Sequence, residues 1–348
     1  MPTVLRFIVI FTLLAVFGIA AALALPFVAA KNLEIYFIDV EGGQATLIVT
    51  PAGHSLLIDT GWRGYDGRDA ERIVQAAKAA KIKQLDYVLI THYHRDHVGG
   101  APALADRMKV GTFIDHGPNM EDTRVVKEDY TDYVKILQRV PIQHLVVKPG
   151  DTIPLKGATV EVLTAAGEHL QAPLTGAGQP NTFCAASPKR DADPSENSRS
   201  LGILLTYEHF RFLDMGDLTW NKELELMCPA NPIGTVTVYL TSHHGLDQSG
   251  SPALVDAIHP RVAIMNNGAR KGGSPAAWQI VKDSPGLEDL WQLHYSMEGG
   301  KEHNAPDSFI ANVDEQCQGK YIQLTAKADG SFTIYNSRNK FTKTYAPK

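Results

Sequence analysis

The spacing of apolar residues predicts strands at the start of the chain, followed by a helix. Apolar side chains stand near every second position, as in a strand with one buried face, in residues 33–40, 45–49 and 55–58. Residues 69–81 place apolar side chains three and four positions apart, which is typical of an amphipathic helix. Residues 85–90 form a short apolar run, which predicts a buried strand leading into a cluster of histidines.

Strands and helices alternate again further along, in two halves of similar size. The predicted helices are 101–108, 130–139 and 275–281, and the predicted strands are 110–114, 145–147, 152–155, 159–163, 201–207, 210–213, 235–240, 262–265, 321–326 and 331–335. Residues 165–198 are rich in Gly, Pro, Ala, Ser and Asn, which predicts a long and therefore often functional loop. This order predicts an α/β (α+β) protein in which two sheets pack face to face with helices outside, a four-layer αββα sandwich.

The first 30 residues differ from the rest of the chain. Arg6 is the only charged residue among them, and residues 7–25 are a run of apolar and small side chains. Small residues at 28–30 then resemble the end of a secretory signal, so we expect cleavage after Ala30. An uncleaved membrane anchor is the alternative, because the run is about long enough to span a bilayer. Either outcome places residues 31–348, interpreted as a single hydrolase domain, in the periplasm or outside the cell, with no membrane contact beyond the N-terminal segment.

The composition is that of an ordinary globular protein without a basic surface. Of 348 residues, 44% are hydrophobic and 20% are charged, and the formal net charge is −5. A chain of this length buries a large core without metal or disulfide staples. The charge balance predicts no stable nucleic-acid complex. It remains compatible with a phosphodiester substrate, because a bound metal supplies positive charge locally.

The main chemical signal is the stretch THYHRDH at residues 91–97, directly after a predicted buried strand. Neutral imidazole and carboxylate are ligands that suit zinc, manganese or iron. His92 and His94 lie on one side of an extended stretch, so they can bind one ion together. Asp96 and His97 follow where the chain must turn, so they can face a second ion. We therefore expect two divalent metal ions, zinc in the first instance, with manganese and iron as alternatives.

The HxHxDH motif at residues 92–97 resembles the signature of the metallo-β-lactamase superfamily. Other stretches resemble that family's motifs in the same order: FIDVEGGQA at 37–45, LIDTG at 57–61, NSRSL at 197–201, GD at 216–217 and SHHG at 242–245. The first and third of these are similar to the ComEC-type hydrolase branch, although the usual DVGQGD is not retained after Val40. The resemblance covers most of residues 33–310. It implies the αββα metallo-β-lactamase fold and a metal centre, and it carries little information about the substrate.

The resemblance also implies roles for individual residues. Asp217 corresponds to the carboxylate that bridges both metals, and Asp59 corresponds to a residue that supports a ligand histidine from behind. In the SHHG stretch one histidine binds metal and the other supports it. We favour His243 over His244 as the ligand, because His243 follows the predicted strand more directly and adjacent side chains diverge.

The third histidine of the first metal site has no clear counterpart in this sequence. Most members of the superfamily place it between the HxHxDH motif and the GD motif, where Asn197 stands at the aligned position. His116, at the end of a predicted strand, and His169, in the predicted long loop, are the other candidates. The alternative interpretation is that His116 is a polar strand end and His169 an exposed loop residue.

The predicted substrate pocket involves the glycine-rich loop at residues 266–273 and a turn near residue 303. Backbone amides and a cation of such a loop can hold a phosphate or a carboxylate. A surface loop with two solvated cations is the alternative. The candidate pocket residues are Asn267, Arg270, Lys271 and His303.

Together these features predict an exported hydrolase in which a metal-bound hydroxide attacks an ester-type bond. Asp96 would orient that hydroxide and take its proton. The resemblance favours a phosphodiester, with a small-molecule lactone or β-lactam as the alternative, because one fold hosts both chemistries. A secreted binding module with a degenerate metal site is a further hypothesis, motivated by the missing histidine.

The three cysteines form no CxxC pair, which argues against a zinc–thiolate site. An oxidising compartment permits one disulfide. We predict that it joins Cys184 to Cys228, which flank the segment carrying Asp217, and leaves Cys317 free. Three unpaired thiols are the alternative.

Overall fold

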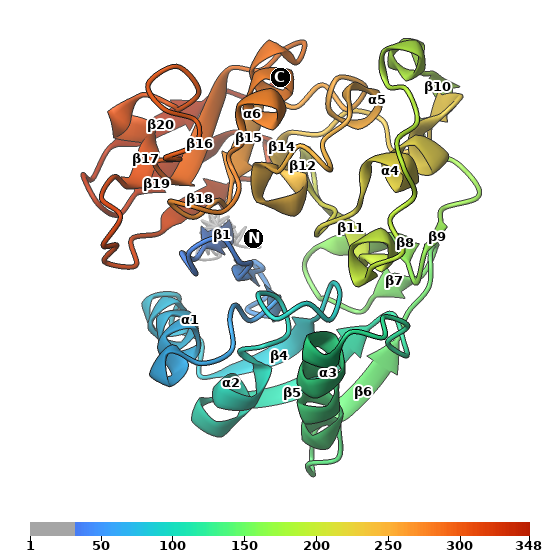
Figure 1. Ribbon diagram of the computed structural model, residues 1–348. Coiled ribbons are helices and arrows are strands. Elements are labelled where there is room, and N and C mark those ends of the chain that lie inside the picture. The colour runs from blue at the N-terminus through green and yellow to red at the C-terminus, as the bar shows by residue number, and fades with distance from the viewer. Residues whose placement is uncertain (1–31) are drawn as a thin grey trace, which may run out of the picture. The chain divides into compact units, whose positions relative to one another are not determined.

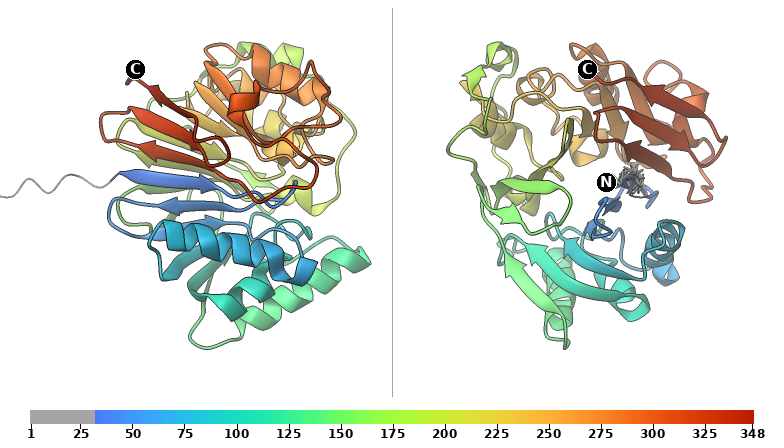
Figure 2. Two further views of the ribbon diagram at one scale, coloured as in Figure 1. Left: turned by 90° about the vertical axis from the view of Figure 1, so that its left-hand side faces the viewer. Right: turned by 180° about the vertical axis from the view of Figure 1, so that it is seen from behind.

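Two large sheets face each other in the computed structural model, which describes residues 32–348; the predicted signal or anchor lies outside these residues. In the first sheet, the strand order is β20 (Thr342–Tyr345), β19 (Phe332–Asn336), β18 (Ile322–Ala326), β1 (Leu33–Phe37), β2 (Thr46–Val49), β3 (Ser55–Ile58), β4 (Gln84–Leu89), β5 (Lys109–Asp115) and β6 (Gln143–Val146). The C-terminal strands therefore lie beside β1, as Figure 2 shows in red and blue. Both ends of the described chain thus contribute to the same sheet.

The second sheet is built from the middle and later parts of the chain. Its strand order is β17 (Ile310–Asn312), β16 (Asp289–His294), β15 (Val262–Met265), β14 (Val238–Leu240), β12 (Phe210–Asp214), β11 (Gly202–Tyr207), β8 (Thr159–Ala165) and β7 (Thr152–Ile153), with β9 (Glu168–His169) also paired to β8. A separate two-stranded sheet joins β10 (Gln179–Pro180) to β13 (Ala230–Asn231).

The core divides into three apolar layers, which together define the αββα sandwich. One layer lies between the two sheets, where Phe37 of the first sheet meets Phe212 of the second with ring centroids 5.8 Å apart. A second layer joins the first sheet to α1 (Arg68–Ala79), α2 (Ala101–Arg107) and α3 (Arg124–Leu137). A third joins the other sheet to α4 (Trp220–Met227), α5 (Pro252–Val255) and α6 (Pro275–Asp283). Figure 1 shows the first three helices at the bottom and the other three at the top.

Parallel strands bring distant loops to one edge of the sandwich. In the first sheet β3, β4 and β5 run parallel, and in the second sheet β12, β14, β15 and β16 do so. Ligands of open α/β sheets bind outside the carboxyl ends of such strands. The loops after β3, β4, β12, β14 and β15 contain the residues that the sequence motifs single out.

Most predicted elements are present, with differences that have local causes. Helix α3 begins at Arg124 rather than at residue 130, because the Thr123 side chain caps it by accepting the Val126 amide. The predicted strand at 235–240 is reduced to Val238–Leu240. The helices α4 and α5 and the strands β16, β17 and β20 are additional to the predicted set, and most of them are too short for a clear period.

The segment between β9 and β11 is largely irregular, as predicted. It contains β10 and two short 3-10 helices, η2 (Thr182–Ala186) and η3 (Glu196–Arg199). The predicted disulfide is present, with 6.0 Å between the Cα atoms of Cys184 and Cys228, and Cys317 is free. The disulfide ties this segment to the residue that follows α4. Within residues 32–348, helices of the length and apolarity needed to cross a membrane are absent.

Candidate metal centre

The loop after β4 is held in place by the end of β3. The Asp59 carboxylate accepts hydrogen bonds from the Thr91 amide (2.8 Å) and from the Thr91 hydroxyl (2.6 Å). Thr60 donates its amide (2.8 Å) and its hydroxyl (2.7 Å) to the carbonyl of His97. Asp59 adopts a positive φ of 60°, a conformation that Asp tolerates better than most residues. Two neighbouring parallel strands therefore fix the HxHxDH loop at both of its ends.

His97 lies at the centre of a buried set of carboxylates. Its Nδ1 donates to Asp59 Oδ2 at 2.7 Å, so a neutral ring carries its lone pair on Nε2. That Nε2 atom lies 3.2 Å from Asp96 Oδ2 and 3.2 Å from Asp217 Oδ2. Asp59 thus occupies the supporting position that the resemblance implies, and it orients the His97 ring toward Asp96 and Asp217.

Both histidines of the turn after β14 face Asp217. His243 and His244 have left-handed backbone conformations, with φ values of 54° and 56°, in the 3-10 turn η4 (Ser242–Gly245). His244 Nε2 is 3.2 Å from Asp96 Oδ2 and 3.4 Å from Asp217 Oδ1, and His243 Nε2 is 3.5 Å from Asp217 Oδ2. The preference for His243 over His244 as the metal ligand therefore gains no support from the geometry, in which both side chains face the centre. That preference assumed an ordinary strand end rather than two consecutive left-handed residues.

His92 and His94 are neighbouring imidazoles, and His92 lies near Asp217. His92 Nδ1 is 3.1 Å from the Thr91 hydroxyl, and its buried Nε2 lies 3.9 Å from Asp217 Oδ2 without a hydrogen-bond partner. His94 Nε2 donates to Glu121 Oε2 at 2.9 Å, and its ring centroid is 4.7 Å from that of His92. In both rings an outer hydrogen bond leaves the other nitrogen free for a ligand bond.

We call the following residues the metal cluster: His92, His94, Asp96, His97, Asp217, His243 and His244. Four of them, Asp96, His97, Asp217 and His244, have ligand atoms that all lie within 4.8 Å of one another. The His97 and His244 Nε2 atoms face each other at 3.2 Å, and the buried His92 Nε2 has no partner. Imidazoles and carboxylates converging in this way fit divalent ions such as zinc, manganese or iron.

Electrostatics within the metal cluster favour a bound cation. Burial tends to raise the pKa of Asp96 and of Asp217, but the neighbouring imidazoles, with Lys271 beside Asp96, hold both pKa values well below the usual range. Burial tends to lower the pKa of His97, but Asp217, Asp96 and Asp59 raise it well above the usual range. The carboxylates thus stay ionised and stabilise positive charge between them. A divalent ion supplies that charge in place of the proton.

None of the three candidates for the missing histidine position contributes a third imidazole there. Asn197 does lie at the centre, where its Nδ2 is 3.4 Å from His243 Nε2. His116 instead donates its Nε2 to the buried Glu196 at 3.1 Å, and its ring packs against Tyr93. His169 lies in β9, where its Nδ1 is 3.1 Å from the Leu170 carbonyl. His116 therefore supports the loop that carries Asn197, and both histidine candidates were wrong.

The predicted pocket residues separate into one that reaches the metal cluster and three that do not. The ammonium of Lys271 contacts Asp96 Oδ2. Arg270 points to Glu315, with 69% of its side chain exposed. The Asn267 amide donates to the carbonyls of Gly268 and His294, and His303 packs edge-on against the ring of Trp278. The predictions for Arg270, Asn267 and His303 were wrong because these side chains stabilise the loops themselves.

One residue at the centre has no signal in the sequence pattern. Glu121, which holds His94, comes from the loop between β5 and α3. Its carboxylate also accepts the Glu196 amide at 2.9 Å and the Thr123 hydroxyl at 2.8 Å. Burial tends to raise the pKa of Glu121, but these hydrogen bonds and the one from His94 lower it. Glu121 thus links the HxHxDH loop to the segment that carries Asn197.

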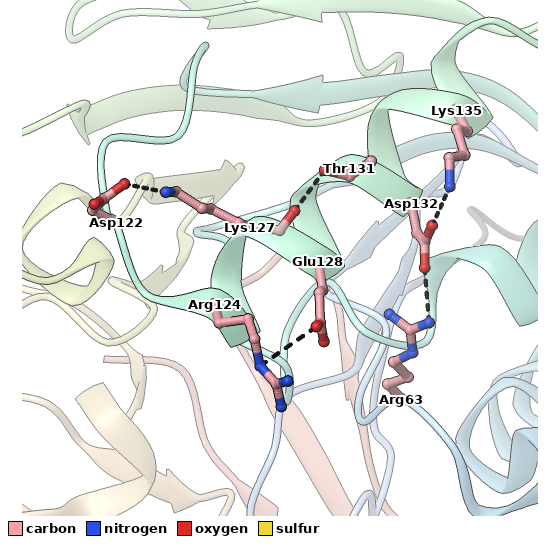
Figure 3. A pocket seen from close by; sticks show the side chains of 8 residues that line it. All are labelled: Arg63, Asp122, Arg124, Lys127, Glu128, Thr131, Asp132 and Lys135. Atoms are coloured by element: carbon pink, nitrogen blue, oxygen red, sulfur yellow. Dashed lines mark hydrogen bonds and ion pairs between the residues drawn. The ribbon is translucent and has the colours of Figure 1, made fainter.

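Two cavities lie near the loops of the metal cluster, and they differ in kind. One of about 540 Å³ is lined by Asn197, Ser195, Thr219 and Trp220 among others, and it borders the metal cluster because Asn197 contacts His243. The other, of about 490 Å³, lies along α3 and is shown in Figure 3. Its cations pair with its own acids, as Lys127 does with Asp122. The first cavity therefore offers room for a substrate, whereas the second is a network of surface ion pairs.

This chain is similar to known metal-dependent hydrolases. Residues 38–186 match the sequence profile of the metallo-beta-lactamase superfamily. A UPF0173 metal-dependent hydrolase from Cupriavidus necator is 31% identical over 301 residues, which cover 80% of this chain and 93% of that protein. The ComE operon protein 3 of Bacillus subtilis is 25% identical over 68% of this chain, but the chain spans only 28% of that protein.

Among solved structures, this chain is similar to the metallo-beta-lactamase fold protein YhfI from Bacillus subtilis. The match covers 75% of this chain and 96% of the YhfI chain. Its TM-score is 0.48 and its sequence identity to this chain is 12%.

Proposed function

Because this chain belongs to the metallo-β-lactamase superfamily of metal-dependent hydrolases, we propose that it cleaves a phosphodiester at a centre of two divalent metal ions. The observation that supports two ions is the number of potential ligands, because the seven side chains of the metal cluster exceed the four that a single zinc ion usually takes. We assign Asp96, His97 and His244, whose ligand atoms lie within 4.8 Å of one another and of Asp217, to one ion. We assign His92, His94 and His243 to the other.

In this proposal each histidine of the SHHG turn serves a different ion. His244 completes the group around Asp96 and His97. His243 takes the position of the third histidine, because its Nε2 lies 3.5 Å from Asp217 Oδ2 while His244, not His243, belongs to the close group around Asp96 and His97. The Ser249 hydroxyl, 3.3 Å from His243 Nδ1, holds the ring from its outer side, and Asn197 lies beside Nε2. The missing histidine therefore does not argue for a degenerate binding module.

The ions, when bound, would lower the pKa of a water molecule and polarise the ester oxygen. The protein's part is to hold and orient. Asp59, Thr91 and Glu121 fix the rings of His97, His92 and His94 by hydrogen bonds to their outer nitrogens. Asp96 stays ionised because His97 and Lys271 hold its pKa low, so it accepts a hydrogen bond from the attacking water and orients it. No protein nucleophile is required.

We further propose that the enzyme works outside the cytoplasm on small molecules or phosphodiesters, without a stable nucleic-acid complex. The apolar residues 7–25 and the small residues that follow support export. The Cys184–Cys228 disulfide supports an oxidising compartment. Zinc is the proposed metal, because imidazole and carboxylate ligands dominate the centre.

The proposal is tested with purified protein, with and without Zn²⁺ or Mn²⁺, on three substrates: bis(p-nitrophenyl) phosphate, nitrocefin and a lactone. We expect hydrolysis of the phosphodiester, loss of activity with a chelator and recovery when metal is restored. Asp217→Asn provides an inactive control. Hydrolysis of nitrocefin or the lactone alone would support the alternative substrate class. No hydrolysis of any substrate, with fewer than one ion bound per chain, would support a binding module.

A further inference from the structure

Lys271 and Arg270 are neighbours in the loop after β15, yet they lie in different environments. The Lys271 ammonium contacts Asp96 and lies over the ring of Trp62, 4.8 Å from its centroid. Its side chain is 30% exposed, so solvent and a substrate can reach it. Arg270 pairs with Glu315 at the surface. The loop therefore directs one of its two cations into the centre and the other away from it.

The backbone around Lys271 is tightly packed, and this packing fixes the direction of the Lys271 side chain. The Gly268 amide donates to the Lys271 carbonyl at 2.7 Å, which closes the loop on itself. A Cβ atom at Gly42 would lie 2.8 Å from the Lys271 Cβ, and one at Gly272 would lie 2.2 Å from the His244 carbonyl oxygen. The Gly273 amide also donates to the His244 carbonyl, at 2.9 Å. Lys271 is thus fixed against both the turn after β1 and the SHHG turn.

We propose that Lys271 is a specificity-determining residue that binds a negatively charged oxygen of the substrate, such as the non-bridging oxygen of a phosphodiester. This inference rests on the proposed function, because it assigns the ligand class of the same centre. Asp96 offsets part of the repulsion between the Lys271 ammonium and bound divalent ions, and a negatively charged substrate oxygen would offset more of it. A neutral ester offers no such anion, whereas a phosphodiester provides a full negative charge for a charge-assisted hydrogen bond. The Trp62 face keeps the lysine stem in place beneath the ammonium.

The test compares Lys271→Gln with Arg270→Gln, a matched control in the same loop. Both variants and the wild type are loaded with zinc to the same measured ratio, and binding of inorganic phosphate is followed by calorimetry. We expect the dissociation constant of phosphate to rise about tenfold in Lys271→Gln and to stay unchanged in Arg270→Gln. We also expect the ratio of kcat/KM for bis(p-nitrophenyl) phosphate to that for the neutral p-nitrophenyl acetate to fall in Lys271→Gln only.

Equal phosphate affinities and equal substrate ratios in the two variants would overturn the role of Lys271. The two proposals fail separately. If the wild type cleaves the phosphodiester but Lys271→Gln behaves like the control, only the role of Lys271 is lost. If the wild type cleaves no phosphodiester but Lys271→Gln still binds phosphate more weakly, the anion site stands and the proposed function does not.

Discussion

Two buried clusters in this protein combine histidine with aspartate, and only one of them has the properties of a metal centre. The metal cluster is described above. We call the second, made of Asp39, His294 and Cys317, the Asp39 cluster, and its potential ligand atoms also lie within 4.8 Å of one another. By residue type and distance alone, both qualify. The difference between them lies in the hydrogen bonds and charges already present.

In the Asp39 cluster both carboxylate oxygens of Asp39 already accept hydrogen bonds. Asp39 Oδ1 accepts from His294 Nε2 (2.7 Å) and from the Glu41 amide (2.9 Å), and Oδ2 accepts from Arg72 (3.1 Å) and from the Cys317 thiol (2.8 Å). The Arg72 guanidinium supplies the positive charge. Burial, together with Asp39, raises the pKa of Cys317 to about 12, so the thiol stays protonated and is a poor metal ligand.

The metal cluster lacks such an internal guanidinium. It combines five imidazoles with ionised carboxylates, and the buried Nε2 of His92 has no partner. Within residues 32–348, Lys271 is the only cation that contacts the metal cluster, and it balances part of the cluster's negative charge from the rim. The buried Nδ1 of His294 in the Asp39 cluster also has no partner. The unbalanced negative charge, rather than an unpartnered nitrogen, therefore distinguishes the metal cluster from the buried network around Asp39.

The largest expected effect is that of Asp217→Asn, which removes the carboxylate shared by the two groups of imidazoles. We expect the metal-to-protein ratio to fall below one and hydrolysis to drop roughly a thousandfold or more. Elemental analysis after dialysis and steady-state kinetics measure both. Asp39→Asn serves as the control and should retain its metal. Retention of the full metal content in Asp217→Asn would show that the shared carboxylate is not a ligand.

Asp39→Asn should have the opposite effect to Asp217→Asn. We expect it to lower the free energy of unfolding and to leave the metal content unchanged. Breaking a buried ion pair costs about 3 to 5 kcal/mol, and Arg72 would keep only the half-exposed Glu41 as an acidic partner. Urea unfolding of the metal-loaded protein measures the change. If the variant instead lost metal with its stability unchanged, the Asp39 cluster would itself be a metal site.

Glu121→Gln weakens the outer support of His94 and should have an intermediate effect on metal affinity. Removing such a partner costs roughly 10 to 100-fold in affinity. Competition with a coloured chelator measures the constant. Glu128→Gln, at a half-exposed position on α3, is the matched control. Equal affinities in the two variants would mean that Glu121 only shapes its loop.

Cys317→Ser should have the smallest effect. The serine hydroxyl still donates to Asp39, so we expect a stability change within about 1 kcal/mol and an unaltered metal content. Thermal unfolding and elemental analysis check both expectations. A fall in bound metal would identify the thiol as a ligand and remove the distinction between the clusters.

The sequence allowed the sandwich and the core of the centre to be predicted because their signals are local. Strand alternation and the HxHxDH stretch are read from neighbouring residues, and His92 to His97 needed only a turn after a buried strand. The supporting role of Asp59 followed from a short motif in the same way. These features depend on a few consecutive residues, so they can be recognised without knowledge of the fold.

Features decided by tertiary contacts were missed or wrong. Glu121 reaches His94 only because the loop after β5 folds back, and no residue spacing in the sequence predicts this contact. Two left-handed residues decide that both His243 and His244 face Asp217. The choice between Lys271 and Arg270 follows from close packing of glycines against other loops. Such contacts join residues far apart in sequence, where a single chain carries no periodic signal.

The central claim, that two ions share Asp217 with one histidine of the SHHG turn on each, is tested most directly by metal content. Elemental analysis of dialysed wild type, His243→Ala and His244→Ala gives three metal-to-protein ratios. We predict two ions for the wild type and one for each variant. A wild-type ratio of one or less, or a variant that keeps two ions, would contradict the account.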